Sequence, residues 1–152
     1  MKYITPGNQI LISVIAAWAM AQISKTLITM YFEKKFIPER LIGPGGMPSS
    51  HSATVCALAV SSALRYSLCS FEFSISLVLA IIVMHDAMNV RLETGKQAKV
   101  INAMLKDKPI DVQGVLLEKQ LKELIGHTPT QVVVGAALGS VVALLVNFIV
   151  NL

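Results

Sequence analysis

Eight residues, Gly45 to Ser52, combine a glycine pair, a proline, three hydroxyls and a histidine directly before an apolar run. Glycines allow backbone N–H groups to converge on an anion, and the start of a helix adds the positive end of its dipole. The hydroxyls of Ser49 and Ser50 can donate further hydrogen bonds, while His51 can transfer a proton or attack phosphorus. The segment therefore has the residue types of a phosphoryl site, although a glycine turn before a serine-capped helix would show the same spacing.

Two more polar groups stand at the ends of apolar segments in distant parts of the chain. Asp86 and Arg91 follow one apolar run, and His127 precedes another, with Thr128 as the expected helix cap. Ionisable groups near the end of a membrane-spanning segment are costly and are usually functional. Two plainer roles stay open: Asp86 and Arg91 could form only a helix-end ion pair, and His127 could serve only the turn. His85 neighbours Asp86 but would face another side of the helix.

The composition of the 152-residue chain is typical of a membrane protein. Hydrophobic residues make up 54% and charged residues 14%, with a mean hydropathy of +0.64, whereas soluble domains average about 25% charged residues. The apolar residues fall into four blocks, each near the length of about 20 residues that crosses a bilayer. These blocks cover residues 10–32, 52–68, 71–90 and 130–152. We predict one integral membrane domain over residues 1–152, an all-α polytopic bundle of about four transmembrane helices.

Small residues recur on two of these blocks where helices would pack. Gly135 and Gly139 form a GxxxG pair in the last block, and Ala53, Ala57 and Ser61 lie on one stripe of the second. Small faces let helices approach closely in lipid, where no hydrophobic effect drives helices together. The pattern predicts helix packing and nothing about function.

The positive charges gather in the loops that follow the first and third blocks. These cations are Lys34, Lys35 and Arg40, then Arg91, Lys96, Lys99, Lys106, Lys108, Lys119 and Lys122. By the positive-inside rule the two loops are cytoplasmic and both termini are external, which brings the three polar groups to the cytoplasmic face of the cell membrane. The net charge of +4 suits an anionic lipid surface. Nucleic-acid binding is not expected, because the cations flank apolar spans without interleaved aromatic residues.

Two further features bear on this face. Between residues 93 and 125, apolar residues recur at helical spacing among lysines on both sides of Pro109, which predicts short amphipathic interfacial helices. Glu123 would then lie one turn before His127, close enough to orient an imidazole. Lys25 lies inside the first block, where it either snorkels to the interface or reaches inward to an anion. The apolar positions of the loop are Val100, Ile101, Met104 and Leu105, then Val115, Leu116, Leu121, Leu124 and Ile125.

Three motifs in this chain resemble those of the divergent type-2 phosphatidic acid phosphatase family, whose members are described as acid phosphatase/vanadium-dependent haloperoxidase-related. They are GGMPSSHSA at 45–53, DAMNVRLETGKQA at 86–98 and LKELIGHTP at 121–129. Ala21, Gln22 and Lys25 extend the resemblance into the first block, so that it covers nearly the whole chain.

The first of these motifs is similar to the Pro-Ser-Gly-His motif of the better-known lipid phosphatases in the superfamily. Pro48, Ser49 and His51 match it, with Ser50 in place of glycine. The resemblance implies that Ser49 and nearby backbone N–H groups bind phosphate. It also implies that His51 protonates the leaving alcohol.

The other two superfamily motifs are altered here. The first motif of the superfamily requires a lysine, six residues and then Arg-Pro. Here Lys34 and Arg40 are one residue too close, and leucine follows Arg40. Arg40 still has the chemistry of a phosphate ligand. The third requires an arginine, a histidine six residues later and an aspartate four beyond; from Arg91 these positions are Gln97 and Ile101.

A second histidine is therefore needed from elsewhere, and His127 could supply it, oriented by Glu123 or Asp86. We expect metal-independent hydrolysis of a membrane lipid phosphomonoester, without a cofactor, by positioning and charge stabilisation. Phosphatidylglycerophosphate, phosphatidate and isoprenyl phosphates are all compatible substrates. The candidate catalytic residues are His51, His127, Asp86 and Glu123, and the candidate phosphate ligands are Lys25, Arg40, Gly45, Gly46, Ser49, Ser50 and Arg91.

Two other functions remain open. The chain could be a non-catalytic membrane protein that binds phosphate or lipid headgroups, or a small transporter component, since the third-motif histidine is missing. A divalent-cation site at Asp86, Glu123 and the histidines is disfavoured, because their spacing matches no metal motif. So small a bundle could form a homodimer to enclose a site.

Overall fold

The computed structural model describes residues 5–34, 46–107, 111–112, 115–116, 121 and 126–152. Most of these residues form the helices α1 (Pro6–Glu33), α2 (Ser50–Tyr66), α3 (Phe71–Met88), α4 (Val90–Asp107) and α5 (Pro129–Asn151). The strands β1 (Asp111–Val112) and β2 (Val115–Leu116) form a two-residue antiparallel pair. The expected helical membrane bundle is confirmed.

Four of the helices begin at a hydroxyl side chain. Thr5, Ser49, Ser70 and Thr128 accept hydrogen bonds from backbone N–H groups in the first turns of α1, α2, α3 and α5. Such caps satisfy donors that the helical hydrogen-bond pattern leaves without partners. The expected Thr128 cap is confirmed, and Gly126 adopts a positive φ of 93° just before it.

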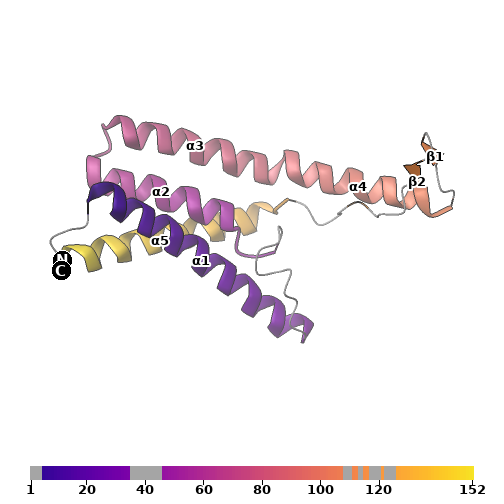
Figure 1. Cartoon of the computed structure of the whole chain (residues 1–152), viewed down its shortest axis with the longest axis horizontal. Coiled ribbons are helices and arrows are strands. Elements are labelled where there is room, and N and C mark those ends of the chain that lie inside the picture. The colour runs from indigo at the N-terminus through magenta and orange to yellow at the C-terminus, as the bar shows by residue number, and fades with distance from the viewer. Residues whose placement is uncertain (1–4, 35–45, 108–110, 113–114, 117–120, 122–125) are drawn as a thin grey trace.

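Three stretches of the described chain are long and apolar enough to cross a membrane: Gly7–Glu33, Phe71–Met104 and Pro129–Asn151. The remaining helix of the expected four, α2, has 17 residues. It is about 26 Å long, whereas a bilayer core is about 30 Å thick. α2 packs against α1, α3 and α5 and lies between them (Figure 1). Its serine-rich surface is therefore enclosed by apolar helices.

Small side chains build the core where α1, α2 and α5 meet. A Cβ atom at Gly135 would collide with the carbonyl oxygen of Ser49, and one at Gly139 would collide with that of Ala53. α5 therefore lies directly on the backbone of α2, as the GxxxG pair predicts. The buried residues of this core are Ala17, Ala21, Ala53, Ala57, Val142 and Ala143.

The short helices expected between residues 93 and 125 are only partly confirmed. α4 begins at Val90 and follows α3 almost in line (Figure 1). Between the start of α3 and Pro109 the chain contains no proline, so it can stay helical, and α4 includes the expected helical positions Val100, Ile101 and Met104. Val115 and Leu116 were expected to be helical, but they form β2 because they pair with β1 across a short connection. The apolar positions 124 and 125 lie outside the described residues.

The chain that leads toward α5 is attached to α4 by a side-chain amide. Asn102 donates to the backbone C=O of Leu121 at 2.9 Å and accepts from its N–H at 3.0 Å. Asn102 and Ala98, one turn apart on the same face of α4, are both 6% exposed. This face of α4 therefore holds Leu121.

The two ends of the bundle differ in what they contain. The start of α1 and the end of α5 lie at one end, whereas the starts of α2 and α5 and the end of α3 lie at the other (Figure 1). His51, Asp86 and His127 belong to these three segments. The structure thus brings the three polar groups to one end of the molecule, as the sequence predicts.

Candidate functional site

Backbone hydrogen bonds join the three segments that carry the polar groups. The N–H of His127 donates to the C=O of Ala87 at 3.0 Å, and the N–H of Ser49 donates to the C=O of Gln131 at 3.1 Å. Gly126 lies so close to the α3–α4 junction that a Cβ there would come within 2.6 Å of Leu92 Cα. These contacts fix the starts of α2 and α5 against the end of α3.

The structure brings His51 and His127 together. Their ring centroids are 6.2 Å apart and the ring planes are inclined at 60°. His51 is exposed in the first turn of α2, whereas His127 is only 3% exposed. The two imidazoles are therefore close enough to act on one small group, which the two-histidine hypothesis requires.

The surroundings of His127 favour its neutral form. Burial lowers the pKa of His127, and the positive charges of Lys25 and Arg91 lower it further. Hydrogen bonding to the Gln131 side chain and to the backbone of Gly46 acts in the opposite direction and raises the pKa. Nδ1 of His127 lies 3.1 Å from Oε1 of Gln131.

The Lys25 side chain points into the helix bundle and not toward its surface. It is 1% exposed and is the largest of the fully buried side chains among the described residues. Its stem lies against Gly46, where a Cβ would approach Lys25 Cγ to 3.1 Å and where φ is +83°. The charge of Lys25 acts on both His51 and His127. The role of Lys25 as a phosphate ligand stays a prediction.

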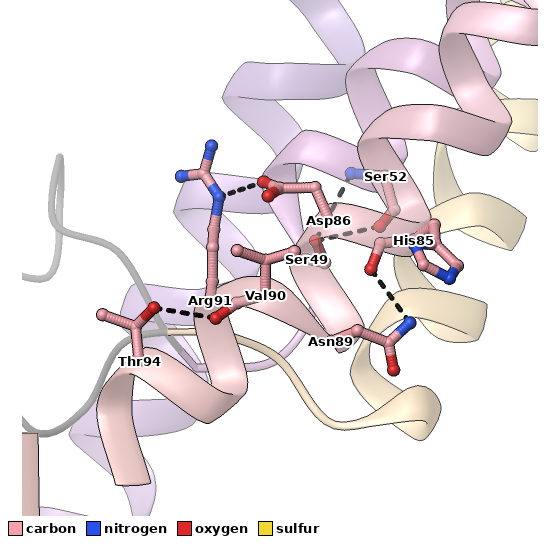
Figure 2. Close-up of polar contacts among 8 residues, drawn as sticks. All are labelled: Ser49, Ser52, His85, Asp86, Asn89, Val90, Arg91 and Thr94. Atoms are coloured by element: carbon pink, nitrogen blue, oxygen red, sulfur yellow. Dashed lines mark hydrogen bonds and ion pairs between the residues drawn. The ribbon is translucent and has the colours of Figure 1, made fainter. Parts of the chain in front are cut away.

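Asp86 and Arg91 form the ion pair that their spacing allows. Arg91 Nε donates to Asp86 Oδ2 across the α3–α4 junction (Figure 2), and both side chains are partly exposed. Both groups also act electrostatically on His51. The ion pair therefore keeps the Arg91 guanidinium near His51 and keeps the Asp86 carboxylate bonded to Arg91.

Ser49 supports the start of α2. Its side chain is completely buried, and its hydroxyl oxygen accepts from the Ser52 N–H at 3.3 Å and the Ser52 hydroxyl at 3.0 Å (Figure 2). Ser50 is also buried, at 5% exposure. The roles of Ser49 and Ser50 as phosphate ligands stay predictions. Arg40, Gly45 and Glu123 belong to the predicted set too, but they lie outside the described residues.

Gln131, whose side chain contacts the ring of His127, was not among the predicted site residues. The pattern Thr128-x-x-Gln131 is a capping box, and the structure forms it completely. That signal would have placed Gln131 at the start of α5, one turn from His127. Within the part of the chain that the structure describes, no three His, Cys, Asp or Glu side chains are grouped so as to hold a metal ion.

Comparisons with known proteins agree with the sequence motifs. The chain matches the family model described as "Divergent PAP2 family" over residues 6–142. It is 37% identical over 148 residues to the "Uncharacterized membrane protein YuiD" of Bacillus subtilis (strain 168), which covers 91% of this chain and 93% of the relative. No solved structure matches it. The family match takes in every described residue of the site from Lys25 to Gln131.

Proposed function

The chain belongs to the Divergent PAP2 family, and we propose on that premise that it is a metal-independent membrane lipid phosphatase. The proposal rests chiefly on one observation, the approach of His51 and His127 to 6.2 Å between ring centroids. Lys25 and Arg91 add positive charge to this pair from two further helices. Two imidazoles beside two cations are suited to bind a phosphoryl group and to transfer its protons.

The proposed reaction uses the two histidines in different roles. Neutral His127 attacks phosphorus, and the bond between phosphorus and the lipid oxygen breaks. His51 gives its proton to the departing lipid alkoxide. A water molecule then attacks the phosphohistidine, its proton passes to His51, and inorganic phosphate leaves. Lys25 and Arg91 stabilise the charge that develops on the phosphoryl oxygens.

The location of the site favours a lipid as the substrate. The histidines lie at the end of a bundle that contains three helical stretches apolar enough to cross a membrane, so a phosphate headgroup would meet them at the membrane surface. Phosphatidylglycerophosphate, phosphatidate and isoprenyl phosphates share the phosphomonoester that this reaction needs. We place the site on the cytoplasmic side, because the flanking loops hold most of the basic residues.

The test is phosphate release by the purified full-length protein from a panel of these lipids in EDTA, with and without vanadate. We expect release that EDTA leaves intact and vanadate inhibits. His51→Ala and His127→Ala should each lower the rate at least about 100-fold, since positioned acid–base groups contribute that much. His85→Ala is the matched control, because His85 is exposed near the end of α3. Full activity in His51→Ala would contradict the proposal.

The alternative is a phosphate- or headgroup-binding protein without catalysis. The specific observation in its favour is that Gln97 and Ile101 replace the third-motif histidine and aspartate. Under this alternative the protein binds vesicles that contain a lipid phosphomonoester, Lys25→Met weakens that binding, and no phosphate is released at any pH. Release by the wild-type chain that His51→Ala abolishes would exclude it.

A further inference from the structure

The orientation of the Gln131 amide is fixed by its own helix. Gln131 Oε1 accepts from the backbone N–H of Thr128 at 3.2 Å, which completes the capping box of α5. Because only the amide oxygen can accept from that N–H, the atom that faces the helix start is the oxygen. The same Oε1 lies 3.1 Å from Nδ1 of His127.

An amide oxygen can accept a hydrogen bond but cannot donate one. Nδ1 of His127 must therefore carry a proton to bond with Oε1 of Gln131. In the neutral ring only one nitrogen is protonated. Gln131 and the backbone of Gly46 both hydrogen-bond to His127, so they compete for that proton, and a proton on Nδ1 leaves Nε2 with its lone pair. The capping box thus places an acceptor, and no donor, against Nδ1 of a buried histidine.

Gln131 is also held from a second side. Its backbone C=O accepts the N–H of Ser49 at 3.1 Å, directly before α2. The residue is thereby attached to the starts of both α2 and α5, the helices that position His51 and His127. This attachment fixes the backbone from which the Gln131 side chain extends, and the Thr128 N–H holds the amide oxygen itself.

We propose that Gln131 is the positioning residue of the site, which holds His127 as the Nδ1–H tautomer and leaves Nε2 as its reacting nitrogen. The proposal rests on the proposed phosphatase function only for its consequence in catalysis. It assigns to a neutral amide the task that was expected of Glu123 or Asp86. Asp86 is instead paired with Arg91.

The choice of an amide has a chemical consequence. A carboxylate bonded to Nδ1 would stabilise the imidazolium ion, whereas an amide orients the ring without adding negative charge. The charged and titratable groups around the two histidines come from every neighbouring helix: Lys25 of α1, His51 of α2, Asp86 of α3 and Arg91 of α4. Among these, the cations also favour the neutral form of His127. A neutral Nε2 is the form that can attack phosphorus.

The experiment compares wild type with Gln131→Glu and Gln131→Leu, using full-length protein labelled with ¹⁵N-histidine. The chain has three histidines, so His51→Ala and His85→Ala assign the signals. At a pH where the ring is neutral, we expect wild-type His127 to show the Nδ1–H tautomer. Gln131→Leu should shift the ring toward Nε2–H.

Gln131→Glu provides the sharper test, because glutamate also completes a capping box and so preserves the start of α5. The carboxylate should raise the midpoint of the His127 titration by about one pH unit. If the protein is a phosphatase, the pH profile of phosphate release should move upward with it. Thr128→Ala is the control: it weakens the cap but leaves the Thr128 N–H, and should change neither tautomer nor titration.

The tautomer and the titration are measured without turnover, so they test Gln131 even if no lipid is hydrolysed. A wild-type His127 in the Nε2–H form would overturn the proposal. So would a folded Gln131→Glu variant whose His127 titrates as in the wild type. Absence of phosphate release together with the Nδ1–H tautomer would instead contradict the phosphatase function alone.

Discussion

The two histidines share a site but differ in their exposure to water. His51 is exposed in the first turn of α2, so it can exchange protons with water between turnovers. His127 is buried and held by Gln131. An acid that must be reprotonated belongs at the exposed position, and a nucleophile that must stay neutral belongs at the buried one. This difference supports the roles proposed for the two residues.

The lowered pKa of His127 predicts a dependence of stability on pH. Burial lowers that pKa below its ordinary value of 6.5, and Lys25 and Arg91 add to the effect. Just below pH 6.5 the unfolded chain therefore binds a proton that the folded chain does not. The stability that comes from keeping His127 neutral is fully present above pH 6.5. It is lost as the pH falls from 6.5 through the lower pKa of the folded protein. We expect the melting temperature to drop on acidification, and His127→Gln to lessen the drop.

The measurement is thermal unfolding in detergent, followed by the fluorescence of Trp18, the single tryptophan of the chain. His85→Gln is the control, because it removes an exposed histidine and should leave the pH dependence as it is in the wild type. An equal drop in melting temperature for His127→Gln and wild type would mean that the pKa of His127 is not lowered by folding.

At the scale of the helix elements, the contact between α2 and α5 predicts the effect of adding a single methyl group. In a free helix, alanine is favoured over glycine by about 1 kcal/mol. At Gly139, however, a Cβ would collide with the carbonyl oxygen of Ala53, so the two helices must separate. We expect Gly139→Ala to destabilise the protein by about 1–3 kcal/mol, the usual range for overpacking.

Gly7→Ala is the matched control for this experiment. A Cβ at Gly7, in the first turn of α1, would have no atom within 4 Å. It should be neutral or slightly stabilising. Both variants are compared by denaturant unfolding in the same detergent. Equal stability of Gly139→Ala and Gly7→Ala would show that α5 does not lie on the backbone of α2 as described.

The elements were predictable where a strong local signal acts alone. The apolar blocks 52–68 and 130–152 correspond to α2 (Ser50–Tyr66) and α5 (Pro129–Asn151), because hydroxyl caps and apolar length set their bounds. β2 was not predictable, since two residues carry no periodicity and its pairing depends on a partner strand. The start of α4 at Val90 was missed because the change from apolar to charged residues resembled a loop.

The site was predictable in its membership more than in its contacts. The charge distribution and the alternation of spans predicted that His51, Asp86 and His127 lie at one end of the bundle. That prediction requires only the order and direction of the helices. The partner of the His127 ring needs coordinates, because Asp86 could reach either Arg91 or a histidine by spacing alone. In the structure Asp86 forms an ion pair with Arg91, and the Gln131 side chain lies beside the His127 ring.

At the scale of the whole molecule, the bundle has two unlike ends. The end that carries the histidines continues into α4, whose exposed residues include Lys96 and Lys99. The opposite end carries the start of α1, the end of α5 and the turn between α2 and α3, where Cys69 is exposed. Basic residues are retained on the cytoplasmic side during insertion. We therefore infer that the histidine end is cytoplasmic and that Cys69 is external.

Cys69 makes this orientation testable with the native chain. A maleimide that cannot cross membranes should label Cys69 in intact cells, and Cys69→Ser should abolish that labelling, since Cys56 is partly buried within α2. A cysteine introduced at the other end by Thr94→Cys, in the Cys69→Ser background, should react only after the membrane is permeabilised. Thr94 is exposed on α4, so burial would not explain its protection. Labelling of Thr94→Cys in intact cells would show the opposite orientation. The proposed phosphatase would then act on lipids of the outer leaflet.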